Sequence, residues 1–223
     1  MLTAFSSLEQ IELIFTALLL LTAFIYLLQD RINGMIHTFS LQSALLAGVT
    51  LTQAIASGDV DLYISAALTI LLKVLFIPSL MRYLVAKLDI RHKVADISHP
   101  FLLLIGAAIL VLFCYHLITP LHQQRLMSTN VIAVAMSVML LGMLLLITHK
   151  KAISHVIGFM SMENGIFFAA LVSTQGMPMA VELGIAFDVL VAAILFGVFF
   201  FHLRSSIDSL DVDRLSLLRE DVE

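Results

Sequence analysis

Residues 100–119 read PFLLLIGAAILVLFCYHLIT, a run of 20 residues without a single Asp, Glu, Lys or Arg. An α-helix needs roughly 20 apolar residues to cross about 30 Å of hydrocarbon, so this stretch predicts a transmembrane helix. Other apolar runs of similar length precede and follow it, separated by polar or charged segments. The predicted spans are residues 11–28, 34–56, 62–84, 100–119, 130–148, 152–174 and 181–203. The sequence therefore predicts an all-α integral membrane protein with about seven transmembrane helices.

The composition indicates that lipid is the solvent of most of the chain. Of the 223 residues, 61% are hydrophobic and 13% are charged, and the mean hydropathy is +1.05. A soluble domain is about half apolar and about a quarter charged, and the excess here is too large for one buried core. The net charge of -4 offers no basic surface, so we expect no nucleic-acid partner. The one cysteine, Cys114, excludes an intrachain disulfide framework.

Lysine and arginine are distributed unevenly between the two sides of the predicted spans. With seven spans, most basic residues fall on one side, whereas the opposite side holds Arg125 and one span holds Lys73. Basic residues concentrate in cytoplasmic loops, so the asymmetry predicts an N-terminus outside the cell and a C-terminus in the cytoplasm. The residues on the predicted cytoplasmic side are Arg31, Arg82, Lys87, Arg91, Lys93, Lys150, Lys151, Arg204, Arg214 and Arg219.

Three ionisable side chains, Lys73, Glu163 and Asp188, fall deep inside predicted spans. A charge at the centre of a membrane helix costs roughly 2.5–3.5 kcal/mol on insertion scales, and such residues nearly always face a partner or a hydrated cavity. A buried ion pair that only holds helices together would explain Lys73 and one carboxylate. It would leave the other carboxylate without a simple partner, so the set favours a proton or ion path.

Several neighbouring residues fit such a path. Burial favours the protonated form of Glu163 and a nearby ammonium favours the ionised form, so this carboxyl could exchange a proton near neutral pH. Asn164 offers an amide that can hold water or bridge helices, and His155 lies two turns away towards the predicted cytoplasmic side. Pro78 removes the amide donor to the Val74 carbonyl, which predicts either a hydrated break beside the lysine or an ordinary packing kink.

No pattern in the sequence predicts a cofactor or a metal. The eight histidines lie mostly at span ends, and none stands three or four residues from another histidine or from Cys114 on a shared helical face. The sequence contains no CxxC, CxxCH, GxGxxG, Walker or nucleophile-elbow pattern. We therefore expect no cofactor, no metal and no catalysis by this chain alone.

Four short motifs, in order along the chain, carry a family resemblance. They are LysValLeuPheIlePro at 73–78, MetGluAsnGly at 162–165, GluLeuGlyIleAlaPheAsp at 182–188 and LeuAspValAspArgLeuSerLeuLeu at 210–218. Over essentially its whole length the chain resembles hydrogenase-4 component E, a membrane subunit of formate hydrogenlyase-type and related group 4 hydrogenase-like complexes. By this resemblance Glu182, which begins the third motif, is a supporting residue of the site.

From about residue 127 the chain also resembles the three-helix K subunit of NADH–quinone oxidoreductase and the C subunit of multisubunit cation/proton antiporters. The shared features are a basic pair at 150–151, an IleGly at 157–158, Asn164 and a polar tail. In the K subunit each of the last two helices carries a glutamate of the proton route. Lining up the IleGly and the Asn places the first on Met160, and matching the basic ends of the last helices places the second near 190–192. Glu163 and Asp188 lie within about one helical turn of these positions, which keeps them on roughly the same helix face.

The two resemblances imply a division of the chain. Residues 1–126 would form a four-helix membrane half, residues 127–204 a three-helix half like the K subunit, and residues 205–223 a cytoplasmic tail. The tail alternates apolar positions with charged ones, which fits an amphipathic segment lying along a partner, and a solvated tail is equally open.

The resemblance implies a non-redox membrane subunit of a proton- or cation-translocating hydrogenase-type oxidoreductase complex, in the plasma (inner) membrane of a bacterium or archaeon. Its partners would be antiporter-like and quinone-oxidoreductase-like membrane subunits, cytoplasmic redox subunits and membrane lipid. The proton relay would consist of Glu163, Asp188 and Lys73, with Asn164, His155, Pro78 and Glu182 in support. Two alternatives stay open: a subunit of a multisubunit cation/proton antiporter, and a purely structural membrane spacer.

Overall fold

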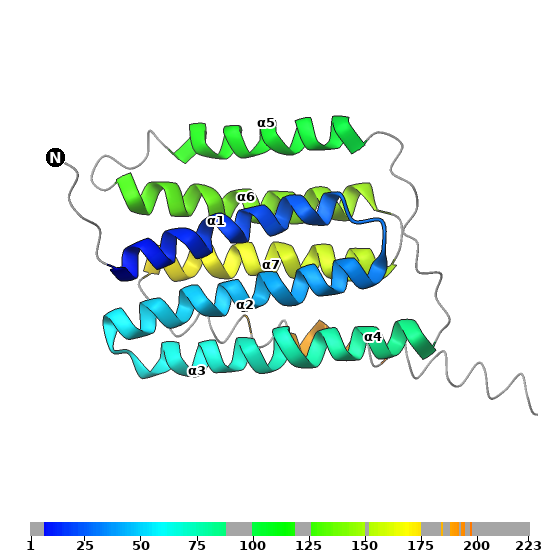
Figure 1. The fold of residues 1–223 in the computed structure, drawn as a ribbon, viewed down its shortest axis with the longest axis horizontal. Coiled ribbons are helices and arrows are strands. Elements are labelled where there is room, and N and C mark those ends of the chain that lie inside the picture. Colours follow the sequence, from blue (N-terminus) through cyan, green and yellow to red (C-terminus); the bar gives the residue numbers. More distant parts are fainter. Residues whose placement is uncertain are drawn as a thin grey trace, which may run out of the picture.

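The computed structural model describes residues 7–87, 100–118, 126–149 and 152–174, together with residues 184, 188–191, 193–194 and 197. Long helices lie side by side with their axes roughly aligned, and short turns join some of them (Figure 1). The elements are α1 (Ser7–Leu27), α2 (Ile32–Ser57), α3 (Val60–Thr69), the π-helix η1 (Ile70–Phe76), α4 (Ile77–Lys87), α5 (Pro100–Ile118), α6 (Leu126–Thr148) and α7 (Ala152–Thr174).

Within the described residues, 6 helical stretches are long and apolar enough to cross a membrane. They are Gln10–Leu27, Ile32–Ser57, Val60–Lys87, Pro100–Ile118, Asn130–Thr148 and Ile153–Ser173. These stretches coincide with the first six predicted spans, which confirms the prediction of an all-α, multi-pass membrane protein. The predicted seventh span, 181–203, lies largely outside the described residues, although residues 188–191 are helical. The total of seven spans and the membrane orientation stay predictions.

A tight turn at Gly58 and Asp59 joins α2 to α3. Gly58 has φ 72°, a left-handed conformation that suits glycine, and its amide donates to the Ala54 carbonyl to end α2. The Asp59 side chain accepts a hydrogen bond from the Asp61 amide at 3.1 Å and so begins α3. Because the turn is short, α3 and η1 return along α2, and the middle of the third span faces the middle of the second.

The third span contains a wide helical turn where Lys73 is located. Residues Ile70–Phe76 form a π-helix between α3 and α4, and the Ile77 amide donates to the Leu72 carbonyl five residues earlier. Pro78 has no amide proton to offer to the Val74 carbonyl, which explains why the regular hydrogen-bond ladder is interrupted here. The freed carbonyl accepts a hydrogen bond from Ser40 Oγ of α2 at 3.0 Å. The Val74 carbonyl is therefore not free, and of the two alternatives for Pro78 this bond favours the packing kink, because α2 supplies a donor.

Helices α6 and α7 approach each other closely because glycines line their interface. A Cβ atom at Gly142 would lie 2.6 Å from the Met162 nitrogen, and one at Gly165 would lie 2.5 Å from the Met139 nitrogen. Small residues allow this backbone-to-backbone packing, which drives helix association in lipid where the hydrophobic effect is weak. The contact holds α7 in place along much of its length.

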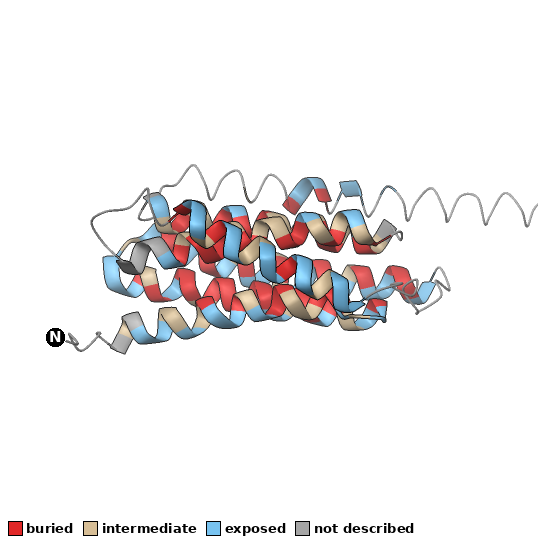
Figure 2. Cartoon of the chain, turned by 90° about the horizontal axis from the view of Figure 1, so that it is seen from above, coloured by how far each residue is buried: buried red, intermediate tan, exposed pale blue. Residues whose placement is uncertain are grey.

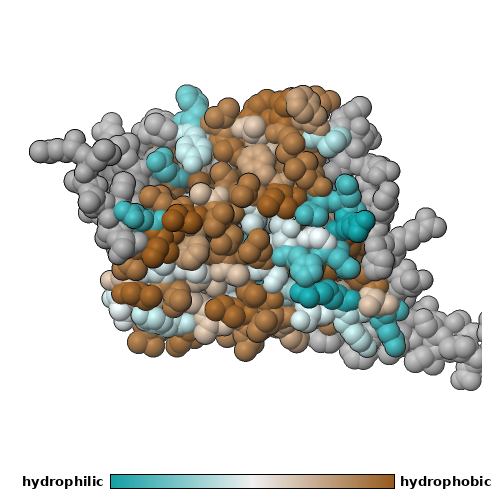
Figure 3. Space-filling view, in the orientation of Figure 1, coloured by the Kyte–Doolittle hydropathy of each residue, from teal (hydrophilic) through white to brown (hydrophobic). Residues whose placement is uncertain are grey.

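The buried residues face the interior of the bundle, and exposed residues lie on its outside (Figure 2). Many of the exposed residues are large and apolar. Helix α5 is the most outward-facing, and brown, apolar surface lies over it in Figure 3. Its exposed apolar residues are Phe101, Leu102, Ile105, Ile109, Leu112, Phe113 and Leu117. One buried apolar core extends through α1, α2, α4, α6 and α7, and therefore joins helices from both predicted halves of the chain. The division into two halves stays a prediction.

Candidate functional site

Lys73 lies at the centre of a buried cluster that unites three helical segments. Its Nζ atom lies 2.8 Å from Glu163 Oε1 and 3.2 Å from Asn164 Oδ1, both on α7. The same Nζ lies 3.5 Å from Asp188 Oδ1, within ion-pair distance. Lys73 is 3% exposed, and Glu163 and Asp188 are 5% and 4% exposed. The structure thus brings together the three charged residues that the sequence singled out, although they are separated by as many as 115 positions, from 73 to 188.

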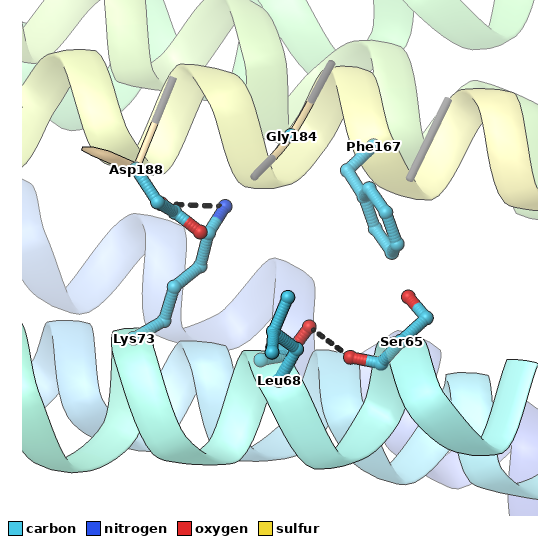
Figure 4. Close-up of a pocket in the computed structure, with 7 residues that line it drawn as sticks. Ser65, Leu68, Lys73, Phe167, Gly184 and Asp188 are labelled. Carbon is cyan, nitrogen blue, oxygen red and sulfur yellow. Dashed lines mark hydrogen bonds and ion pairs between the residues drawn. The ribbon is translucent and has the colours of Figure 1, made fainter. Parts of the chain in front are cut away.

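Two of these three segments, η1 and α7, position their side chains in different ways. The π-helical turn widens the third span around Lys73, and such turns occur frequently at functional sites. On the other side, Glu163 and Asn164 are adjacent on α7, so their side chains leave the helix about 100° apart. Lys73 lies within hydrogen-bond distance of both. The carboxyl of Asp188, which follows α7 in the sequence, also lies beside the ammonium (Figure 4).

A hydrogen-bonded network extends from Asn164 into α2 and α1. Asn164 Nδ2 lies 3.3 Å from both Gln42 Oε1 and Ser43 Oγ, and Tyr26 Oη donates to Gln42 Oε1 at 3.4 Å. An ammonium can only donate, so Asn164 must direct its oxygen towards Lys73 and its amide protons towards α2. The network therefore has one orientation, which the charge of Lys73 sets.

Sequence reasoning missed the members of this network on α1 and α2. From the sequence, no role was assigned to Gln42, Tyr26 or Ser43. The available signal was the polar pair at positions 42 and 43 within a membrane helix, because polar groups in lipid are expensive unless they are bonded. Which helix they would meet is set by packing and could not be read from the pair itself.

A small cavity adjoins the cluster. It offers about 10 Å³ to the centre of a water molecule, which is room for roughly one water. Figure 4 shows Asp188 and Lys73 at one end of it and Phe167 and Ser65 at the other. The lining residues are Ser65, Leu68, Thr69, Lys73, Phe167, Gly184 and Asp188.

Several buried polar atoms near the cluster have no hydrogen-bond partner among the described residues. They include Glu163 Oε2, Asp188 Oδ1, Gln42 Nε2 and Ser161 Oγ. For Asp188 Oδ1 the distance to Lys73 is an ion-pair distance without hydrogen-bond geometry. Unsatisfied polar atoms cost about 1–3 kcal/mol each when buried, and at functional sites they often mark where water or a transferred proton binds.

The structure describes two of the remaining predicted residues, His155 and Pro78. His155 is exposed on α7, and at 1.5 Å per residue it lies roughly 12 Å along the helix from Glu163. Pro78 is buried one turn beyond Lys73, and Glu182 lies outside the described residues. His149, which follows the end of α6, is buried, and burial lowers its pKa below the usual value. Within the part of the chain that the structure describes, no group of His, Cys, Asp or Glu is placed to hold a metal ion.

The fold and the cluster define a class: a multi-pass α-helical membrane protein with a buried lysine–carboxylate site. Within this class, the chain is similar to hydrogenase-4 component E of Escherichia coli, with 26% identity over 184 residues, covering 81% of this chain and 84% of that protein. It is also 27% identical over 204 residues to an uncharacterized protein of Mycobacterium tuberculosis, covering 91% of this chain and 93% of that protein. These similarities confirm the resemblance predicted from the four motifs. No family model and no solved structure matches the chain.

Proposed function

We propose that this chain is a non-redox membrane subunit of a hydrogenase-type oxidoreductase complex and carries part of its proton- or cation-translocating path. The similarity to a hydrogenase component of Escherichia coli supports membership of such a complex. The observation that carries the translocation role is the buried Lys73 within ion-pair distance of two carboxylates on different segments. The chain would contribute no catalytic group of its own.

In this proposal the cluster transfers protons between Glu163 and Asp188. Lys73 bonds Glu163 at 2.8 Å and lies 3.5 Å from Asp188, so a small side-chain movement would exchange its partner. The carboxylate that loses the ammonium gains affinity for a proton, and the one that gains it releases a proton more readily. Asn164 supplies a neutral oxygen that bonds the ammonium in either position. When the Lys73 ammonium moves from one carboxylate to the other, the proton therefore moves in the opposite direction.

The partners would lie against the outward apolar faces and at the cytoplasmic end. Antiporter-like and quinone-oxidoreductase-like membrane subunits would flank the bundle, cytoplasmic redox subunits would complete the complex, and lipid would cover the remaining apolar surface. The complex would lie in the plasma (inner) membrane of a bacterium or archaeon. Purification of the native complex with an affinity tag on this chain tests the assignment: hydrogenase-type redox subunits support it, whereas antiporter subunits alone support the alternative antiporter reading.

The substitution Glu163→Gln tests the relay itself. Glutamine keeps the size and hydrogen bonding of the side chain but cannot carry a proton. In vesicles containing the intact complex, we expect proton translocation to fall at least about tenfold while the complex still assembles. Glu12→Gln is the matched control, because Glu12 lies in another span and bonds Gln53 Nε2 at 3.2 Å, away from the cluster. Unchanged translocation in Glu163→Gln contradicts the relay, and loss of assembly alone supports buried charges that only join helices.

A further inference from the structure

The buried cluster contains more acidic groups than basic ones. Lys73 is one cation, and Glu163 and Asp188 are two carboxyls. The other described element that bonds the cluster is α2, and its contributions, Gln42 and Ser43, do not ionise. An uncompensated charge in a low-dielectric interior is most readily relieved by a proton. A cluster of this composition is therefore neutral when it holds one proton.

The geometry distinguishes the two carboxyls. Glu163 Oε1 accepts a hydrogen bond from Lys73 at 2.8 Å, the distance typical of an ammonium bonded to an ionised carboxylate. Asp188 Oδ1 lies 0.7 Å farther from the same nitrogen, at 3.5 Å, and has no hydrogen-bond partner among the described residues. Asn164 Oδ1 takes a second donor of the ammonium on the Glu163 side. Glu163 therefore has the environment of the ionised partner, and Asp188 that of the protonated one.

The cavity provides the second, independent observation. Asp188 lines it, together with Ser65, Thr69 and Phe167, and the cavity has room for about one water molecule. A neutral carboxyl has a proton to donate, and a water in this position could accept it. Asp188 is the carboxyl that lines the cavity, whereas Glu163 is not among its lining residues.

We infer that Asp188 stores one proton and exchanges it with a water molecule bound in this cavity. The inference rests on the proposed function, since a stored proton serves a relay only if it is passed on. Release breaks the O–H bond of the Asp188 carboxyl, transfers the proton to the water and leaves a carboxylate. Lys73 then lies between two carboxylates, and a second proton taken up by Glu163 restores neutrality.

The position of the cavity also assigns a side of the membrane to this exchange. Ser65 and Thr69 lie on α3, which precedes Lys73 in the third span, and Phe167 follows Glu163 on α7. The cavity therefore lies towards the end of the bundle where α3 begins and α7 ends. The distribution of basic residues predicts that this end faces outside the cell, so Asp188 would exchange protons with the outer side.

Infrared spectroscopy of the full chain tests which carboxyl holds the proton. A protonated carboxyl gives a C=O stretching band that an ionised carboxylate lacks, and ¹³C in that carboxyl lowers the frequency of the band. The protein would be made by cell-free synthesis with ¹³C in the side-chain carboxyl of either aspartate or glutamate. It would be placed in nanodiscs of ether-linked lipids, which have no ester carbonyl. We expect a carboxyl band near neutral pH that shifts with labelled aspartate, does not shift with labelled glutamate and disappears in Asp188→Asn.

The control is Asp61→Asn, since Asp61 is an exposed aspartate in the first turn of α3 and its replacement should leave the band unchanged. A band that shifts with labelled glutamate overturns the inference and places the proton on Glu163. The absence of any carboxyl band near neutral pH overturns it as well. Because this measurement needs no partner subunit, its outcome is separable from that of Glu163→Gln on translocation. A proton on Asp188 with unchanged translocation in Glu163→Gln would retain the storage site and reject the relay.

Discussion

Helices α7 and α5 are both long and apolar enough to cross a membrane, yet α7 is largely buried and α5 is largely exposed. Most of α7 packs against other helices or the buried cluster, although Ile166 is exposed, whereas α5 has three buried residues, Ala107, Cys114 and Ile118, and presents most of its surface outward. Helix α7 carries glycines against α6 and the polar pair Glu163–Asn164 towards Lys73. We infer that the buried charge of Glu163 depends on the close packing of α7 against α6. This packing fixes the backbone of α7, and a fixed backbone keeps the Glu163 carboxyl 2.8 Å from the Lys73 ammonium.

The largest effect should follow removal of the charge that α7 faces. Lys73→Met keeps the length of the side chain and leaves two carboxyls without a cation. Breaking a buried pair costs about 3–5 kcal/mol, and uptake of a second proton should bring the loss of unfolding free energy here to about 3 kcal/mol. Thermal unfolding of the purified chain in detergent measures it.

The matched control for this change is Lys87→Met, since Lys87 is exposed at the end of α4. The triple change Lys73→Met, Glu163→Gln and Asp188→Asn should recover part of the lost stability, because it removes the uncompensated carboxyls. Equal stability of Lys73→Met and Lys87→Met would show that the cluster does not depend on the ammonium.

The next largest effect concerns the glycine interface. Gly142→Leu places a side chain where even a Cβ atom would lie 2.6 Å from backbone of α7, so the helices must separate. We expect the free energy of unfolding to fall by about 2–3 kcal/mol. This is the upper end of the range for overpacking, because backbone atoms move aside less easily than a side chain does. Gly106→Leu on α5 is the control, since a Cβ there meets nothing within 4 Å. The fraction of monodisperse protein in size-exclusion chromatography compares the two, and equal fractions would reject the idea that this contact fixes α7.

A smaller effect should follow a change in the supporting network. Gln42→Leu removes the acceptor of both Asn164 Nδ2 and Tyr26 Oη and should cost about 1–2 kcal/mol, because both donors are buried. Gln53→Leu makes the same replacement on the same helix at a half-buried position and should cost less. Chemical or thermal unfolding of the two variants side by side decides the order, and a larger loss in Gln53→Leu would contradict it.

The smallest effect should come from the outward face of α5. Ile109 is 60% exposed, and lipid or detergent chains replace the methyl groups that Ile109→Ala removes. We expect the melting temperature of the isolated chain to change by less than about 2 °C, corresponding to a loss under roughly 0.5 kcal/mol. Ile157→Ala, at a fully buried position on α7, should lower it clearly. A large loss in Ile109→Ala would mean that α5 is held by specific contacts and not by its apolar surroundings.

Much of the site was predictable because charges in membrane spans are rare. Lys73, Glu163 and Asp188 stand out in the sequence because a charge inside a membrane span costs free energy. Each such charge needs a partner, which is why these residues were expected to lie close together. The motifs at 73–78 and 162–165 added a family resemblance that the comparison with Escherichia coli confirms. The role of these residues in proton transfer remains a prediction.

Other features of the site could not be predicted because they depend on contacts between distant helices. The Val74 carbonyl was expected to be free, but Ser40 of α2 bonds it, and nothing near position 40 in the sequence points to position 74. His155 lies on α7 two turns from Glu163, as its position in the sequence predicts, and is exposed, so its part in a relay stays a prediction. Helical spacing gives the separation of two residues on one helix and says nothing of which neighbouring helix each one faces.

Hydrophobic length decided the membrane-spanning helices, because in hydrocarbon every backbone amide must be bonded within its own segment and only a helix does so locally. The same constraint marked the charged side chains inside those helices as residues in need of partners. Tertiary packing alone decided the unequal distances of 2.8 and 3.5 Å from Lys73 to its two carboxyls, the network through Gln42 and the cavity beside Asp188. These depend on how closely glycines allow helices to approach and where the wide turn of η1 places the lysine, both of which arise only when distant segments are packed together.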